Sequence, residues 1–196
     1  MGPSETLIDR FFHHATDEAT RRAPEQLAAL AVSMAEVSAS RAPGRAAVCV
    51  VNPTEADQGW SSRHTVVQVV TDDMPFIVDS VLGEIARHGL HVHQLLHPQM
   101  VVADDGEVLD VEPRDAGPGQ RAESWVLVEI ERVRRPEDRE ALVAGLDSVL
   151  ADARRAFEDW PSMRQRARGI IAELELAPPS TVDPSTVQPV VDFLRW

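Results

Sequence analysis

The chain has 196 residues, of which 43% are hydrophobic, and a formal net charge of −13. This length and apolar content predict one ordinary folded domain with additional elements. The negative charge argues against nucleic acid and anionic membranes as partners, because their phosphate groups would be repelled. The single cysteine, Cys49, excludes an internal disulfide, and its valine-rich surroundings predict a small buried side chain. Since there is no signal-peptide pattern and no apolar run of membrane-spanning length, the expected location is the cytoplasm.

The first part of the chain is expected to form two helices within residues 4–39, where apolar residues recur at helical spacing. Ser4 is a suitable N-cap for the first helix. Pro24 fits the first turn of the second. The valine-rich segments 45–51 and 64–71 then predict two buried strands.

A change to helical spacing of the apolar residues predicts a helix over residues 72–89. Asp72 or Asp73 is expected to cap its first amides, because no basic residue stands close enough in the sequence to suggest another role. Pro75 fits the first turn of this helix. Gly89 fits the position just after its end.

Residues 90–103 predict a further strand, which Pro98 interrupts. Because proline cannot donate a hydrogen bond to a strand ladder, this strand should lie at a sheet edge or carry a bulge. The remaining predicted elements are a polar connection over 104–123, a strand over 124–133, helices over 135–160 and 161–177, a loop over 178–186 and an apolar helix that begins at Val187.

From residue 45 onward the predicted order is a strand, then strand–helix–strand, then strand–helix. Such units build an antiparallel sheet with helices on one face, as in the α+β sandwich of ferredoxin-like folds. The usual last strand of that fold has no counterpart after Trp160. We therefore expect segment 45–51 to take its place beside segment 64–71, in an α+β domain flanked by N- and C-terminal helices.

Four histidines lie within residues 88–99, which raises the question of a metal site. In a regular strand His91 and His93 would face the same side about 6.6 Å apart, whereas His97 would lie about 13 Å beyond His93. A zinc site needs three or four protein ligands, and no spacing in the sequence supplies the others. The preferred interpretation is a half-exposed strand face that carries imidazoles, with no bound metal.

The sequence carries no familiar catalytic motif. Glycine-rich phosphate loops, a nucleophile elbow and the paired histidines of zinc proteases are all missing from it. On its own residues the chain is predicted to be non-catalytic.

The stretch "VVTDDMPFIVDSVLGEIARHGLHVHQLLHPQ", residues 69–99, resembles the N-terminal region of the large bacterial NAD-dependent glutamate dehydrogenases. Residues 124–160 and the closing "VVDFLRW" are similar to that family more weakly. The resemblance implies an ACT-like regulatory or oligomerisation module at the front of a longer chain. That parent enzyme would oxidise L-glutamate to 2-oxoglutarate and ammonia, with its NAD site beyond this chain and no cofactor within it.

The resemblance also implies an effector site, commonly for an amino acid, at the turn between the first strand and first helix of the module. In this sequence the turn comprises Thr71, Asp72, Asp73, Met74, Pro75 and Phe76. Backbone amides at a helix N-terminus can receive a carboxylate there. Phe76 stands where many such modules have glycine after the proline.

Three functional hypotheses follow. The first is a non-catalytic module that makes homo-oligomer contacts and contacts with the rest of its own polypeptide. The second is an amino-acid effector sensor, and the third is a metal-binding protein that uses His91 and His93. The expected domains are a helical segment over residues 1–44, the ACT-like domain over 45–160 and a helical linker over 161–196.

Overall fold

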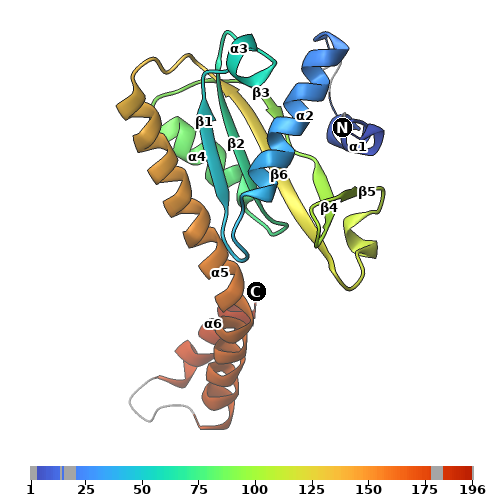
Figure 1. Ribbon diagram of the computed structural model, residues 1–196. Helices are drawn as coiled ribbons and strands as arrows, with labels where there is room; N and C mark the ends of the chain where they lie inside the picture. The colour runs from blue at the N-terminus through green and yellow to red at the C-terminus, as the bar shows by residue number, and fades with distance from the viewer. Residues whose placement is uncertain (1–3, 14, 16–20, 178–182, 196) are drawn as a thin grey trace. The chain divides into compact units, whose positions relative to one another are not determined.

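The computed structural model of the chain describes residues 4–13, 15, 21–177 and 183–195. Figure 1 labels its elements, which are α1 (Glu5–Phe12), α2 (Pro24–Ala39), β1 (Ala47–Val51), α3 (Glu55–Gln58), β2 (Thr65–Asp72), α4 (Ile77–Arg87), β3 (Val92–Leu96), β4 (Gln99–Ala103), β5 (Val108–Leu109), the 3-10 helix η1 (Pro113–Asp115), β6 (Gln120–Ile130), α5 (Pro136–Leu176) and α6 (Pro184–Arg195). The chain divides into two compact units, Met1–Ala153 and Arg154–Trp196. The domain boundaries expected from the sequence stay predictions.

The first unit is built on a six-stranded antiparallel sheet with the order β1-β2-β6-β4-β5. Strand β3 pairs with the other half of the long strand β6. Strand β1 lies beside β2, with Cys49 opposite Gln68. The predicted α+β class is confirmed, and so is the early strand in the place of the missing last one.

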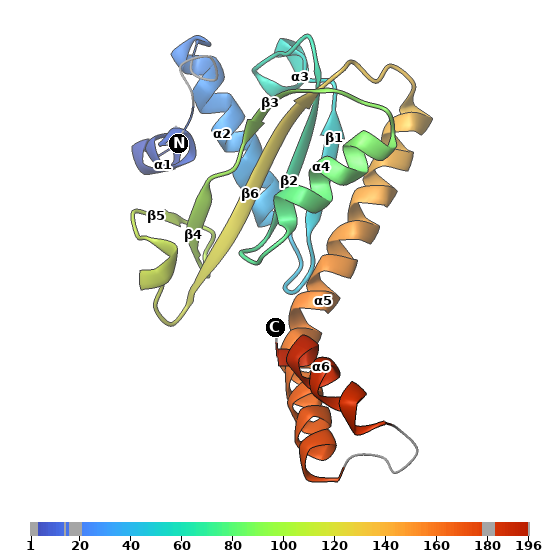
Figure 2. The same cartoon turned by 180° about the vertical axis from the view of Figure 1, so that it is seen from behind.

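Both faces of this sheet are covered by helices. On one face, alternate valines of β2 and β6 pack against the apolar stripes of α4 and the first half of α5. On the other face, Trp125 and Leu127 of β6 pack against α1 and α2. Figure 1 shows α2 in front of the sheet, and Figure 2 shows α4 in front of it after the half-turn. The N-terminal helices, expected only as flanking elements, therefore form a third layer.

The N-terminal helices begin where the sequence predicts. Ser4 caps α1, because the backbone N–H of Leu7 donates to Ser4 Oγ at 3.2 Å. Pro24 is the first residue of α2. At the end of α4, Gly89 has a φ of +71° and its N–H donates to the carbonyl of Ala86, as expected for the residue that ends a helix.

The predicted effect of Pro98 is confirmed. The expected strand over 90–103 is divided at this proline into β3 and β4, which pair with successive parts of β6. Strand β3 lies at the sheet edge and carries a register shift between Val92 and Gln94. Strand β4 is enclosed by β5 on its other side.

Three expected boundaries were wrong. The polar connection contains β5, η1 and the first residues of β6, which are held in the sheet by their pairing with β4. Pro161 lies inside the continuous helix α5, although an interior proline removes a hydrogen bond and its ring crowds the carbonyl of the preceding turn. Helix α6 begins at Pro184 and not at Val187. Residues 178–182 of the predicted loop, and Trp196, lie outside the described residues.

The second unit consists of the end of α5 and helix α6. Val191 of α6 is buried, and an ion pair joins Arg195 to Glu175 of α5. Along the described part of the chain, no helix combines the length and apolar character that crossing a bilayer requires.

Candidate functional site

The turn that the sequence singled out joins β2 to α4. Thr71 and Met74 are buried, whereas Asp72 and Asp73 are half-buried. The predicted capping role of the aspartates is wrong. Asp72 is the last residue of β2 and α4 begins only at Ile77, with no side-chain hydrogen bond to its first amides. The helix begins three or four residues later than a cap at Asp73 or Asp72 would require, and both carboxylates have other partners.

Phe76 has an unusual backbone conformation. Its φ is +71°, and among the described residues it is the one non-glycine with a positive φ. This left-handed region costs an L-residue roughly 1–2 kcal/mol, so the phenylalanine adopts a conformation that suits glycine. Its side chain is 63% exposed. The turn therefore presents Pro75 and an aromatic ring at its surface.

Asp72 is held by an arginine from the distant helix α2. Arg41, which follows α2 and whose side chain is 2% exposed, places Nη1 at 2.8 Å from Asp72 Oδ1 and Nη2 at 2.7 Å from Glu123 Oε1. Glu123 of β6 is completely buried, and its other oxygen accepts hydrogen bonds from Ser38 Oγ and Trp125 Nε1. The expectation that no basic partner lies near the aspartates is therefore wrong.

Asp73 is held by a second network, from β4 and β6. Ser124 Oγ donates to Asp73 Oδ1 at 2.6 Å, and Gln99 Nε2 donates to Asp73 Oδ2 at 2.8 Å. His97 Nε2 lies 3.2 Å from Ser124 Oγ. Because the single serine proton is given to Asp73, His97 Nε2 must carry a hydrogen and donate. Burial lowers the pKa of His97, and the negative charge of Asp73 opposes that shift.

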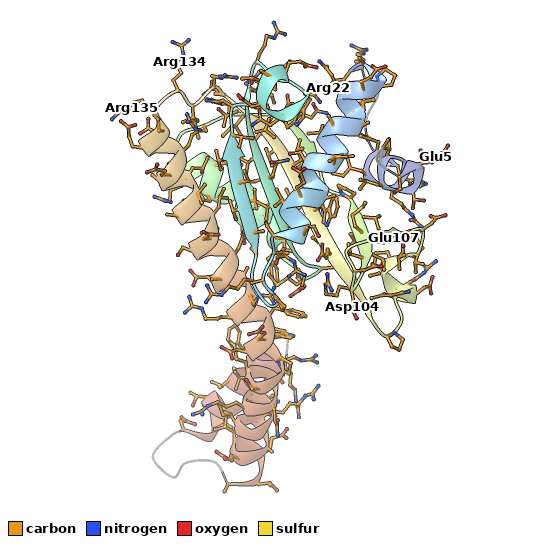
Figure 3. The ribbon with its side chains drawn as sticks, viewed as in Figure 1. Glu5, Arg22, Asp104, Glu107, Arg134 and Arg135 are labelled. Carbon is orange, nitrogen blue, oxygen red and sulfur yellow. The ribbon has the colours of Figure 1, made fainter. Side chains whose placement is uncertain are left out.

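A second buried carboxylate of β6 lies beyond this site, near the beginning of α2. Glu129 is 5% exposed and forms an ion pair with Arg22. Figure 3 shows Arg22 at the N-terminal end of α2. The arginines that flank α2 therefore each hold one buried glutamate of β6, one on either side of the apolar contact between α2 and the sheet.

A hollow of about 490 Å³ adjoins the turn. It contains acidic and basic groups together, since Asp73 and Glu112 lie on its wall with Arg114, whose side chain is 84% exposed. The rest of its wall is formed by Gln99, Pro113 and Ala122. A small molecule that carries both charges would find a complementary group for each.

The histidines do not lie as a regular strand would place them. His91 precedes β3 and pairs with Glu131, whereas the ring of His93 stacks on His64 with the ring centres 4.0 Å apart. The register shift within β3 explains the departure from simple alternation. Within the described ranges, no group of three or more histidine, cysteine, aspartate and glutamate side chains is placed to hold a metal ion. The two-histidine hypothesis thus gains no further ligands there.

Sequence reasoning found the turn but missed the residues that hold it. Arg41, Glu123, Ser124 and Gln99 come from three other elements, and none carries a local motif. One signal was available in β6, where Glu123 and Glu129 interrupt a run of apolar residues. A charge at such a position is either exposed or paired when buried.

Matches to known proteins indicate the family of this chain. The family model described as "Glutamate dehydrogenase, ACT1 domain" matches residues 7–146. An NAD-specific glutamate dehydrogenase of Halomonas elongata is 38% identical over 154 residues, which cover 76% of this chain and 9% of that protein. One of Pseudomonas aeruginosa is 30% identical over 199 residues, which cover 99% of this chain and 12% of that protein. The chain thus spans about a tenth of the length of these relatives, and it belongs to the family of glutamate dehydrogenase ACT1 domains.

Proposed function

We propose that the chain is a non-catalytic regulatory and assembly module of an NAD-specific glutamate dehydrogenase. The observation that carries this proposal is the family match, which extends from α1 to α5 and so includes the N-terminal helices together with the sheet. The polar groups of the candidate site hold structural elements together: Asp72 is paired with Arg41, and both oxygens of Asp73 accept hydrogen bonds. On this proposal NAD binding and glutamate oxidation belong to the rest of the polypeptide, in the cytoplasm.

Two measurements test this role. The purified 196-residue chain should reduce no NAD with glutamate as the substrate, and it should self-associate in sedimentation experiments. In the complete dehydrogenase, removal of residues 7–146 should change the oligomeric state or the response to effectors. Turnover by the chain alone, or a truncated dehydrogenase with unchanged assembly and regulation, would contradict the proposal.

A second candidate function is recognition of a small amino-acid effector at the turn Thr71–Phe76. The hollow beside Asp73 favours it, because Arg114 can receive a carboxylate while Asp73 and Glu112 can receive an ammonium group. Titration calorimetry with a panel of amino acids would detect such binding. Arg114→Ala should abolish the heat without unfolding the chain, since the Arg114 side chain is 84% exposed. If no amino acid produces heat, the effector function is contradicted and the assembly role is the one that stays.

A further inference from the structure

Strand β1 forms one free edge of the sheet. It pairs only with β2, and its register runs without a shift from Ala47–Val70 to Val51–Val66. Its sequence, "AVCVV", has no charge and no proline. A regular, uncharged edge strand offers unpaired backbone groups to another strand.

The edge formed by β3 is different, because it carries features that oppose pairing. Its register shifts between Val92 and Gln94, and Pro98 stands two residues after its last residue, Leu96. Beside its first residue, His91 Nδ1 lies 3.3 Å from the carboxylate of Glu131. Bulges, prolines and charges are the means by which proteins protect a strand edge. A proline stands equally close after β1, at Pro53, so the two edges differ in the bulge of β3 and the carboxylate beside it, whereas β1 has a continuous register and no charge among its own residues.

A groove of about 350 Å³ runs beside β1. Val50 of β1 lines one side of it, and the flank of α5 lines the other with Pro136, Arg139, Glu140, Val143, Ala144 and Asp147. The charged residues of its wall are Arg139 and Glu140 toward one end and Asp147 toward the other. Arg139 donates to the carbonyl of Val133, the same atom that Asn52 binds just after β1. Asp147 interacts electrostatically with Arg45, just before β1.

We infer that β1 pairs in antiparallel fashion with β1 of a second copy of this chain, about a two-fold axis at Cys49. In this register Val48 faces Val50 of the second copy and no charged residues face each other along the strands. The last residues of β1 in one copy, which lie next to Arg139, are then beside the first residues of β1 in the second copy. Those first residues lie next to the second copy's Asp147. Each of the two grooves thus brings Arg139 of one copy to Asp147 of the other. This inference rests on the proposed assembly role and names the surface that performs it.

Charge reversal tests the pairing in the whole 196-residue chain. Sedimentation equilibrium should show a dimer that Arg139→Glu and Asp147→Arg each weaken at least about tenfold, because each opposes like charges across the axis. The double variant should recover the dimer. Glu107→Arg reverses an exposed charge just before β5, at the opposite end of the strand order from β1, so it is the matched control and should leave the association unchanged. Thermal unfolding of every variant separates lost pairing from lost folding, since Arg139 also binds backbone carbonyls.

Cross-linking tests the register. Cys49 is the only cysteine of the chain, and a residue opposite itself in an antiparallel pair has a Cα separation of about 4.5–5.5 Å, which suits a disulfide. Diamide, which takes two protons and two electrons from the two thiols, should therefore yield a disulfide-linked dimer that Cys49→Ser abolishes. A dimer that ignores both charge reversals and does not cross-link would overturn the β1 interface while keeping the assembly role. A chain that is monomeric at every concentration would overturn both.

Discussion

The ion pairs of Arg41 should contribute strongly to stability, and Arg41→Met is the substitution that measures this. It would leave the completely buried Glu123 with one cationic partner, Arg121, whose Nε atom lies 3.7 Å away on a side chain that is 41% exposed. Removing one member of a buried ion pair costs about 3–5 kcal/mol. Glu123 retains its hydrogen bonds from Ser38 and Trp125, so the lower end, about 3 kcal/mol, is expected. A unit of this size should lose about 6–12 °C in melting temperature.

Urea unfolding followed by tryptophan fluorescence provides the assay. In the double variant Arg41→Met/Glu123→Gln no buried charge is left alone, so the loss should be smaller than the sum of the two single losses. Arg135→Met is the matched control, since Arg135 pairs only with exposed acids on α5 and points into solvent in Figure 3. It should leave the free energy of unfolding nearly unchanged. A cost below about 1 kcal/mol for Arg41→Met, or strict additivity in the double variant, would refute this reasoning.

Five further substitutions, in three groups, test local features by urea unfolding. Phe76→Gly should give a protein about 1 kcal/mol more stable than Phe76→Ala, because both remove the ring but only glycine relieves the left-handed backbone; equal stabilities would argue against strain there. Gly83→Ala, in open space on α4, should stabilise by about 0.5–1 kcal/mol, whereas Gly145→Ala should destabilise, because its methyl group would lie 1.8 Å from Glu84 Oε1. Hydrogen bonds from Arg87 hold the pKa of Glu84 below its ordinary value despite burial. Ionised Glu84 therefore stabilises the fold at pH values above its unfolded pKa. This stabilisation is lost as the pH falls through the pKa of the folded state. Glu84→Gln should therefore lose less stability than the parent chain between neutral pH and pH values below about 4.3, and an unchanged pH dependence would count against this assignment.

The architecture of the sheet followed from the sequence because local patterns carried it. A run rich in valine marked β2, and the interruption at Pro98 marked the division between β3 and β4. The place of β1 beside β2 followed from a missing strand, which is a constraint of topology. These features depend on residues near each other in the chain, so a single sequence is enough to reveal them.

The second covered face could not be predicted in the same way. The sequence of α2 is apolar around most of its circumference, which indicates burial but not against which surface. Side chains alternate along β6, so Glu129 points to the other face of the sheet from its neighbour Val128. A glutamate in that position would ordinarily be predicted to face solvent. Its ion pair with Arg22 joins residues more than a hundred positions apart. No local pattern encodes that contact.

The turn was identified from a distinctive string of residues, but its aspartates have other partners than the predicted ones. Asp72 and Asp73 looked like helix caps because that is what aspartate most often does before a helix. The outcome depends on Arg41 and Ser124, which reach the turn only once α2 and β6 are packed. The glycine-like conformation of Phe76 was equally hidden, because propensity disfavours it and only the surrounding structure imposes it.

The two networks at the turn link it to different parts of the module. Asp72 leads through Arg41 to the end of α2, and Asp73 leads through Ser124 to β6 and through Gln99 to β4. A ligand that engaged Asp73 would have to replace hydrogen bonds that position β4 and β6, whereas one that engaged Asp72 would compete for an arginine that also neutralises buried Glu123. Because an uncompensated buried charge is costly, the second change would be resisted more strongly than the first. The Asp73 side of the turn, which faces the hollow beside Arg114, is therefore where an effector could bind at the lower structural cost.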